Sequence, residues 1–344
     1  MSVVHRVRLP VDAVPTVAVG DRVEPAEVLA TRRPPGTGRS LPVAEPLFRS
    51  ARSAADCIAV QPGTILEEGD LLAADGEGRE VRVPQACLLL GYDTYDGTAM
   101  IAPLGGAEPI LGHVRGEVSA LDDESVEVQV AGSLLTGIGG YGGAVHGELR
   151  VAVHHPTEEL RAASIDVGAT GRIVVGGSRA SAETLTRARA MGVAGIVLGG
   201  VLDRDLRDFE TTQARRRDVG GMSGEFAVLV VAGFGKVGLD PALFAWLVAH
   251  DGHMASLFGE VGRLYVYDAS PPPSRRALPR AGDRVIAHRR PHAGASGELL
   301  RVLDGLHAVP SGLASRCGLV RFEDGLTAIV PLANLEATEP LPGS

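Results

Sequence analysis

Three short glycine-containing segments hold the residues best suited to bind a ligand. They are Gly176-Gly177-Ser178, Gly199-Gly200 and Gly233–Gly238, the last of which contains Lys236, the only lysine in the chain. Each follows a predicted strand and precedes a predicted helix, where free backbone amides can hold an anion. The pattern predicts a phosphate or carboxylate site formed by Gly176, Gly177, Ser178, Gly199, Gly200 and Lys236. The alternative is that these small residues only let helices pack closely on strands.

Other signatures of chemistry are weak. The close histidine pairs, His250 with His253 and His154 with His155, lack an HExxH motif or a carboxylate that would complete a zinc site. Gly221-Met-Ser223-Gly224 lacks the spacing of a nucleophile elbow. Cys57 and Cys87 are expected in strands as buried, inert thiols. The sequence therefore predicts no catalytic residue and no metal ligand, and it favours a non-enzymatic protein.

The glycine-rich run 137–143 is a different case. Strands are predicted on both sides of it, whereas dinucleotide and Walker sites place their glycines at the start of a helix. We therefore expect a tight turn there, with close backbone approach as the alternative.

Alternating strands and helices are predicted to position the three glycine segments. Apolar runs indicate strands at 172–175, 194–198, 226–231 and 263–267. Helices are expected from Ser181 to about Met191, from Asp203 through Phe209, and from Asp240-Pro241 to about His250. This alternation favours a largely parallel sheet covered by helices.

Composition sets the broader class. The 344 residues suggest two or three domains, and 45 glycines with 22 prolines suit short strands and tight turns. The net charge is −9, although arginines outnumber acidic residues between Arg275 and Arg321, which permits a nucleic-acid contact there. Three unpaired cysteines and no apolar run of membrane-spanning length indicate a cytoplasmic protein without a membrane segment.

These patterns predict a multidomain fold of α/β and β units. The expected parts are an N-terminal β domain over 1–112 with a loop insertion at 31–53, a small β domain over 113–160, an α/β module over 161–268, a proline-rich linker over 269–280 and a C-terminal β-barrel over 281–344.

The N-terminal domain carries two related segments, 14–30 and 58–73, each with a Gly-Asp pair among spaced valines and leucines. They resemble the hairpins of biotinyl and lipoyl domains and of other barrel-sandwich hybrid domains. The resemblance implies a carrier fold, whose biotin or lipoate attaches to a lysine. Because this part contains no lysine, we expect no cofactor of either kind.

The C-terminal part resembles a KOW motif in an SH3-like barrel. The residues that carry the resemblance are Gly282–Ile286, Pro291–Leu299 and Phe322–Glu336. KOW domains bind RNA, ribosomes or proteins, so the resemblance implies contacts by Arg284, Arg289, Arg290, His292 and Arg301. Arg290 stands where the motif usually has glycine, and 303–316 looks like an insertion.

The whole chain resembles an uncharacterised bacterial family that joins these two units, with genes near accessory ATPases of the glutamate-mutase type, which implies a protein partner. Three hypotheses follow, in order of preference. The first is a non-enzymatic adaptor or scaffold that docks a protein. The second is an RNA- or ribosome-associated protein, and the third is a small-anion binder, for example of phosphate or nucleotide, at the glycine segments.

Overall fold

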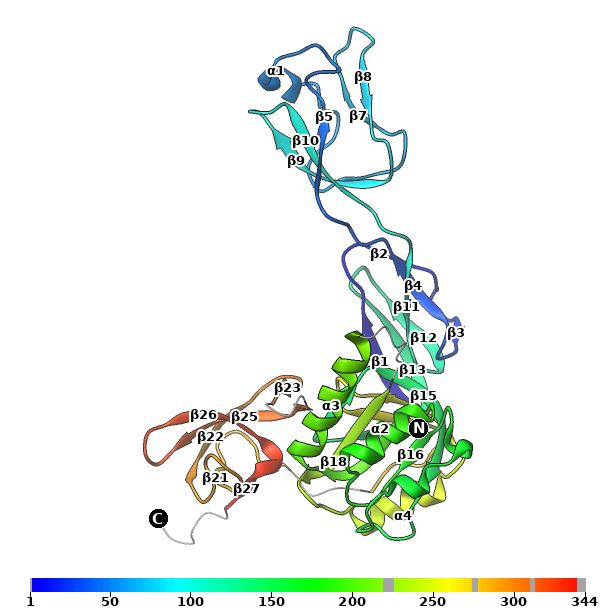
Figure 1. Cartoon of the computed structure of the whole chain (residues 1–344), viewed down its shortest axis with the longest axis vertical. Helices are drawn as coiled ribbons and strands as arrows, with labels where there is room; N and C mark the ends of the chain where they lie inside the picture. The colour runs from blue at the N-terminus through cyan, green and yellow to red at the C-terminus, as the bar shows by residue number, and fades with distance from the viewer. Residues whose placement is uncertain (1, 219–225, 274–277, 310–312, 339–344) are drawn as a thin grey trace.

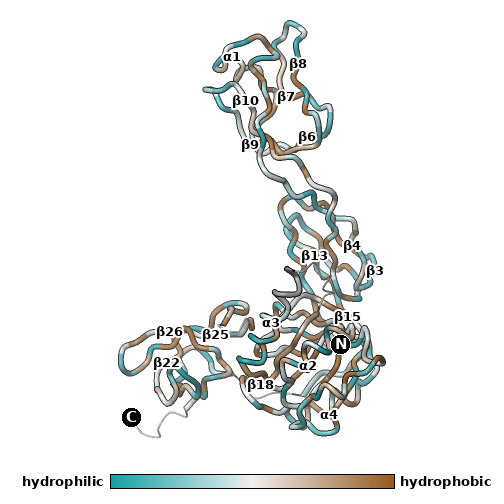
Figure 2. Tube along the Cα trace, in the orientation of Figure 1, coloured by the Kyte–Doolittle hydropathy of each residue, from teal (hydrophilic) through white to brown (hydrophobic). Residues whose placement is uncertain are grey.

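The computed structural model describes residues 2–218, 226–273, 278–309 and 313–338. It is mostly β, with several sheets arranged as an upper module, a middle β region, a helix-covered body and a lateral C-terminal module (Figure 1). Figure 2 shows hydrophobic segments along the strands of the body and again within the upper module. Among the described helices, none is long and apolar enough to cross a membrane.

Residues 39–103 form the upper unit, which we call the distal module. Its sheet has the order β5-β10-β9-β6, and a separate hairpin pairs β7 with β8. Its elements are β5 (Arg39–Pro42), α1 (Ala51–Ala55), β6 (Ile65–Leu66), β7 (Leu71–Ala74), β8 (Glu80–Arg82), β9 (Cys87–Asp93) and β10 (Thr98–Pro103).

The segment 31–53, expected as a loop, thus contains β5 and most of α1, which begins because the Ser50 side chain caps it. Cys57 follows α1 and does not lie in a strand, contrary to expectation, whereas Cys87 begins β9.

The distal module is inserted between two strands of the middle β region. β4 (Val28–Arg32) precedes it and β11 (Glu108–Leu111) follows it, and these two strands pair with each other. The other strands of this region are β1 (Ser2–Arg8), β2 (Ala13–Pro15), β3 (Arg22–Val23), β12 (Gly116–Leu121) and the first half of β13 (Ser125–Thr136). Because β1 pairs with β13 over its whole length, the sheet crosses the domain boundary expected between residues 112 and 113.

The second half of β13 belongs to the body. Described strands form a 13-stranded sheet in the order β23-β24-β14-β18-β17-β16-β15-β19-β20-β13-β12-β3, with β1 paired to β13. The body contributes β14 (Gly139–Gly142), β15 (Ala144–Val151), β16 (Ile173–Val175), β17 (Gly195–Val201), β18 (Ala227–Phe234), β19 (Met254–Phe258) and β20 (Arg263–Tyr267). Among the strands that the structure describes, only the four from β15 to β18 are mutually parallel, so the sheet is mixed.

Three helices cover the body sheet. α2 (Ala182–Ala190) and α4 (Pro241–Ala249) begin as predicted, capped by the side chains of Ser181 and Asp240. α3 (Asp203–Asp218) is longer than expected, and it packs beside α2. α4 connects β18 to β19, which pairs antiparallel with β15.

The C-terminal module has a five-stranded antiparallel sheet in the order β26-β25-β22-β21-β27. These strands are β21 (Arg284–Ala287), β22 (Ser296–Val302), β25 (Cys317–Phe322), β26 (Thr327–Pro331) and β27 (Leu335–Ala337). The inserted segment adds β23 (His307–Ala308) and β24 (Ala314–Ser315), and β24 pairs with β14 of the body. The expected tight turn at 137–143 is therefore wrong, since Gly139–Gly142 is a strand between β18 and β24.

Candidate functional site

A cleft of about 790 Å³ lies where the body meets the C-terminal module. We call it the junction cleft. Its body side is formed by Leu202 and Asp203 after β17 and by Phe234 and Gly235 at the end of β18. Ligands of α/β sheets bind outside the carboxyl ends of parallel strands, so the cleft lies at the edge where a binding site is expected.

The three predicted glycine segments lie side by side behind this edge. The amides of Gly199 and Gly200 donate to the carbonyls of Gly177 and Ser178, at 3.0 and 2.6 Å. The amide of Gly235 donates to the carbonyl of Val201 at 2.7 Å. The segments therefore lie side by side, and the amides of Gly199, Gly200 and Gly235 are already used as donors within the protein.

Close packing explains why glycines stand there. A Cβ on Gly199 would lie 2.4 Å from the carbonyl oxygen of Val237, and one on Gly177 would lie 2.3 Å from that of Glu158. Gly176 and Ser178 are buried as well. The alternative interpretation, that small residues allow tight packing, therefore accounts for these positions. Lys236 alone among the predicted anion-binding residues is exposed.

The opposite wall of the cleft brings in residues predicted to contact RNA or a partner. Arg289, Arg290 and His292 all line it, and a guanidinium N–H of Arg289 donates to the Phe234 carbonyl at 3.1 Å. The His292 ring stacks on Phe322, with ring centroids 4.7 Å apart. Of the glycine segments, only Phe234 and Gly235 of the third share the cleft with these residues, and none of the six residues predicted to bind an anion lines it.

Arg284 and Arg301, the other two arginines predicted to contact RNA or a partner, do not line the cleft. Arg284 forms an ion pair with Glu323, and Arg321 pairs with Glu298 at 2.7 Å. Arg301 is exposed and has no ion pair or hydrogen bond within the described part of the chain. The arginines expected to form one RNA surface are therefore divided, and two of the strand arginines are neutralised by neighbours.

Sequence reasoning missed several lining residues. His307 and Val309 reach the cleft from the inserted segment, and Cys317 follows it. The Cys317 side chain is buried and donates to the Ser315 carbonyl at 3.5 Å. Burial raises the pKa of this thiol, so it is neutral and a poor nucleophile. The available signal was the length of the insertion between the two halves of the predicted barrel.

A second candidate surface is the outer face of the distal sheet. Ile65, Leu90 and Met100 are 49%, 48% and 43% exposed. The space beside Gly38 is bordered by both Leu90 and Met100, and Ile65 is paired with Leu88. Three neighbouring strands, β6, β9 and β10, thus present large apolar side chains to solvent.

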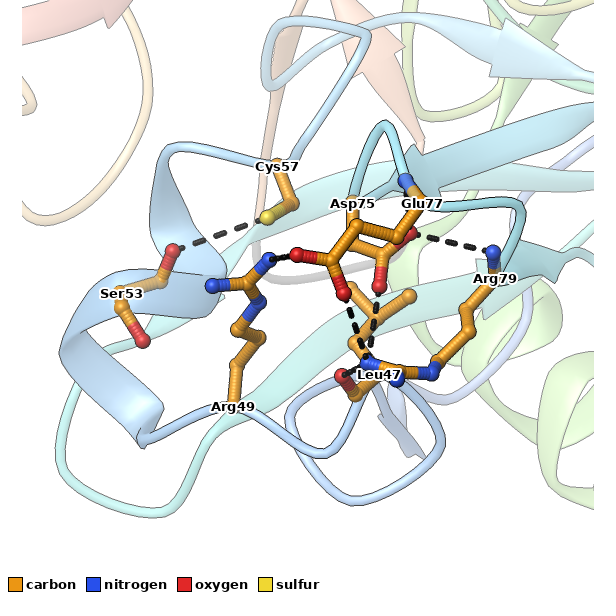
Figure 3. A network of polar contacts seen from close by, with 7 residues as sticks. All are labelled: Leu47, Arg49, Ser53, Cys57, Asp75, Glu77 and Arg79. Carbon is orange, nitrogen blue, oxygen red and sulfur yellow. Dashed lines mark hydrogen bonds and ion pairs between the residues drawn. The ribbon is translucent and has the colours of Figure 1, made fainter.

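The β7–β8 hairpin of the same module is closed by a polar network (Figure 3). Asp75 accepts hydrogen bonds from the amides of Glu77 and Arg79 at 2.8 and 3.1 Å and from the Arg79 guanidinium at 3.0 Å. Arg79 also donates to the Leu47 carbonyl, and Glu77 pairs with Arg49. Desolvation raises the pKa of Asp75, but these amides and the Arg79 charge outweigh it and hold the pKa below its usual value. The hairpin is thus held by contacts within its turn and by contacts to residues 47 and 49.

Comparison with protein-family models and with curated proteins finds no match to this chain.

Proposed function

We propose that the protein is a non-enzymatic adaptor that docks a protein partner through the apolar outer face of the distal module. The observation that carries the proposal is the cluster of Ile65, Leu90 and Met100, nearly half exposed on adjacent strands. Contiguous apolar side chains on a surface typically mark an interaction site.

The form of the sheet supports docking on its face and not along its edge. The edge strands β5 and β6 are only four and two residues long, and β5 ends in Pro42. Short edges that contain proline resist the addition of a further strand. A partner that presents its own apolar patch fits this face better than an extended peptide.

The proposal includes finer fold assignments. We propose residues 1–112 as a barrel-sandwich hybrid without an attachment lysine, and the C-terminal module as a KOW-like SH3 barrel. The five-stranded antiparallel sheet supports the second assignment, whereas the segments 14–30 and 58–73 that carry the first lie in two separate units, the middle β region and the distal module. The RNA hypothesis has less support, because Arg284 and Arg321 are neutralised by carboxylates.

Affinity capture from an extract of the native host tests the proposal, with the tagged full-length chain as bait. A double variant, Leu90→Glu with Met100→Glu, should lower partner recovery at least about tenfold, because burying charge in an apolar interface is costly. The matched control is Val248→Glu with Val261→Glu, which changes two comparably exposed valines of the body and should leave recovery unchanged.

Circular dichroism of both double variants establishes that they are folded. The proposal fails if the wild-type chain recovers no reproducible partner. It also fails if the folded distal variant recovers the partner as well as the wild type does.

A further inference from the structure

We infer that the junction cleft binds a small organic anion that carries an apolar or ring-shaped body. The inference concerns a site apart from the docking face, since the cleft lies between the body and the C-terminal module.

The first feature of the cleft is its positive charge. Arg290 is exposed and makes no hydrogen bond or ion pair with any described residue, and Arg289 uses one guanidinium nitrogen, Nη2, on the Phe234 carbonyl. Among the described residues, Asp203 is the one carboxylate that lines the cleft, and it is paired with Arg207. The lining thus carries an excess of positive charge at Arg289 and Arg290, and an arginine fork matches carboxylate and phosphate oxygens.

The second feature of the cleft is its apolar lining. Leu202, Phe234, Val309 and Val330 line the cleft together with Ile329, which is 59% exposed. A bare inorganic ion would leave this apolar surface in water, whereas a ligand with a ring or an alkyl body would cover it. The volume of about 790 Å³ falls in the range typical of small-molecule sites.

The distribution of charge argues for a small molecule and against a nucleic-acid strand. A strand needs a row of free cations along its backbone. Outside the cleft, Arg284 and Arg321 of the same module are paired with Glu323 and Glu298. Arg301, outside the cleft, is unpaired among the described residues, but this single exposed arginine does not make a row of free cations along the sheet.

The probe for the test is 1-naphthyl phosphate, which combines a ring system with one anionic group and is fluorescent. Its fluorescence anisotropy should rise on titration with the full-length protein. Arg290→Glu should weaken binding about tenfold or more, because a charge-assisted hydrogen bond is replaced by repulsion. Arg301→Glu makes the same charge change on the same module outside the cleft, and it should change affinity less than about twofold.

A second variant and a competition series extend the binding test. Arg290→Gln removes the charge without reversing it and provides a second variant if Arg290→Glu does not fold. Competition by AMP and by benzoate separates a phosphate head group from a carboxylate, and inorganic phosphate should compete far less well than either.

Displacement of the probe by either organic competitor supports the inference. It is overturned if the wild-type protein does not bind 1-naphthyl phosphate, or if neither organic anion displaces it. Equal affinity of wild type and a folded Arg290 variant would also overturn it, as would an equal loss in Arg301→Glu.

Discussion

The distal module and the C-terminal module are both small β units, but they are joined to the rest of the molecule differently. The distal module is reached through two chain segments that meet at the bridge between Pro35 and Leu104 and at hydrogen bonds of Gly36 and Gly105. The C-terminal module follows one linker and adds a strand pairing, since β24 pairs with β14. One module keeps an open apolar face, and the other encloses a cleft with the body.

The cores differ in the same way. Buried residues of the distal module, such as Leu47 and Leu89, form a cluster separate from those of the other parts. Leu278, in contrast, packs against both the core of the body and that of the C-terminal module. Strand pairing fixes the relative direction of two segments. The short pairing of β24 with β14 and the contact of Leu278 with both cores therefore fix how the two walls of the cleft face each other.

The largest expected effect on the free energy of unfolding comes from breaking the pairing of β24 with β14, which joins the C-terminal module to the body. A Cβ on Gly139 would lie 2.5 Å from the Ala314 carbonyl oxygen. Gly139→Val should therefore lower the free energy of unfolding by about 3 kcal/mol and weaken binding of 1-naphthyl phosphate. Chemical denaturation measures the first effect. The control is Gly143→Val, just after β14, where no atom lies within 4 Å of the added Cβ; similar losses in both variants would contradict this account of the junction.

A smaller effect concerns how the middle β region is held to the body. His5 of β1 is buried and bonds to the Tyr265 hydroxyl at 3.0 Å. Burial, with the charge of Arg263 and nearby His113, lowers its pKa from 6.5 to about 4. A lowered histidine pKa favours the neutral form in the fold, so its contribution is complete above pH 6.5 and is lost as the pH falls toward 4.

Between pH 8 and pH 5 this loss amounts to about 2 kcal/mol of unfolding free energy. His5→Phe should remove that part of the pH dependence in denaturation curves. The exposed His154 provides the control, since His154→Phe should retain the wild-type slope. An unchanged slope in His5→Phe would mean that another group dominates the acid response.

The smallest expected effect lies in the distal hairpin. Asp75→Asn removes the charge that pairs with Arg79, so the amides of Glu77 and Arg79 should exchange hydrogen faster while the body is unaffected. Because the pKa of Asp75 is lowered in the fold, its stabilising contribution exists at neutral pH and disappears as the pH falls through that lowered pKa. The control is Glu80→Gln, which breaks only the ion pair between Glu80 and Arg82, two side chains that are each about half exposed. It should change the exchange rates of these amides little. Equal exchange in both variants would show that Asp75 does not lock the hairpin.

The sequence predicted the body better than the modules around it. Caps such as Ser181 and Asp240 and the apolar runs near them are local signals, and the helices and strands formed close to where they indicate. α3 exceeded its prediction because its polar sequence after Phe209 offers no apolar pattern to mark the helix. The strand at Gly139–Gly142 was not predicted because glycine disfavours strands. Glycine is needed there because neighbouring strands approach its backbone closely, and such long-range contacts cannot be read from the local sequence.

The candidate site was predicted only in part. Gly199, Gly235 and Arg289 were each singled out, but their roles depended on contacts between segments far apart in the chain. The occupied amides of the glycine segments and the ion pair of Arg284 with Glu323 cannot be read from spacing. The docking face was not anticipated at all, because exposure of Leu90 and Met100 depends on the sheet order.

The most direct test of the adaptor proposal is hydrogen–deuterium exchange of the full chain, alone and in the complex recovered with its partner. The proposal predicts that amides of β6, β9 and β10 become protected in the complex while the C-terminal module is unchanged. Protection confined to the C-terminal module or the body, with the distal sheet exchanging as in the free chain, would contradict it.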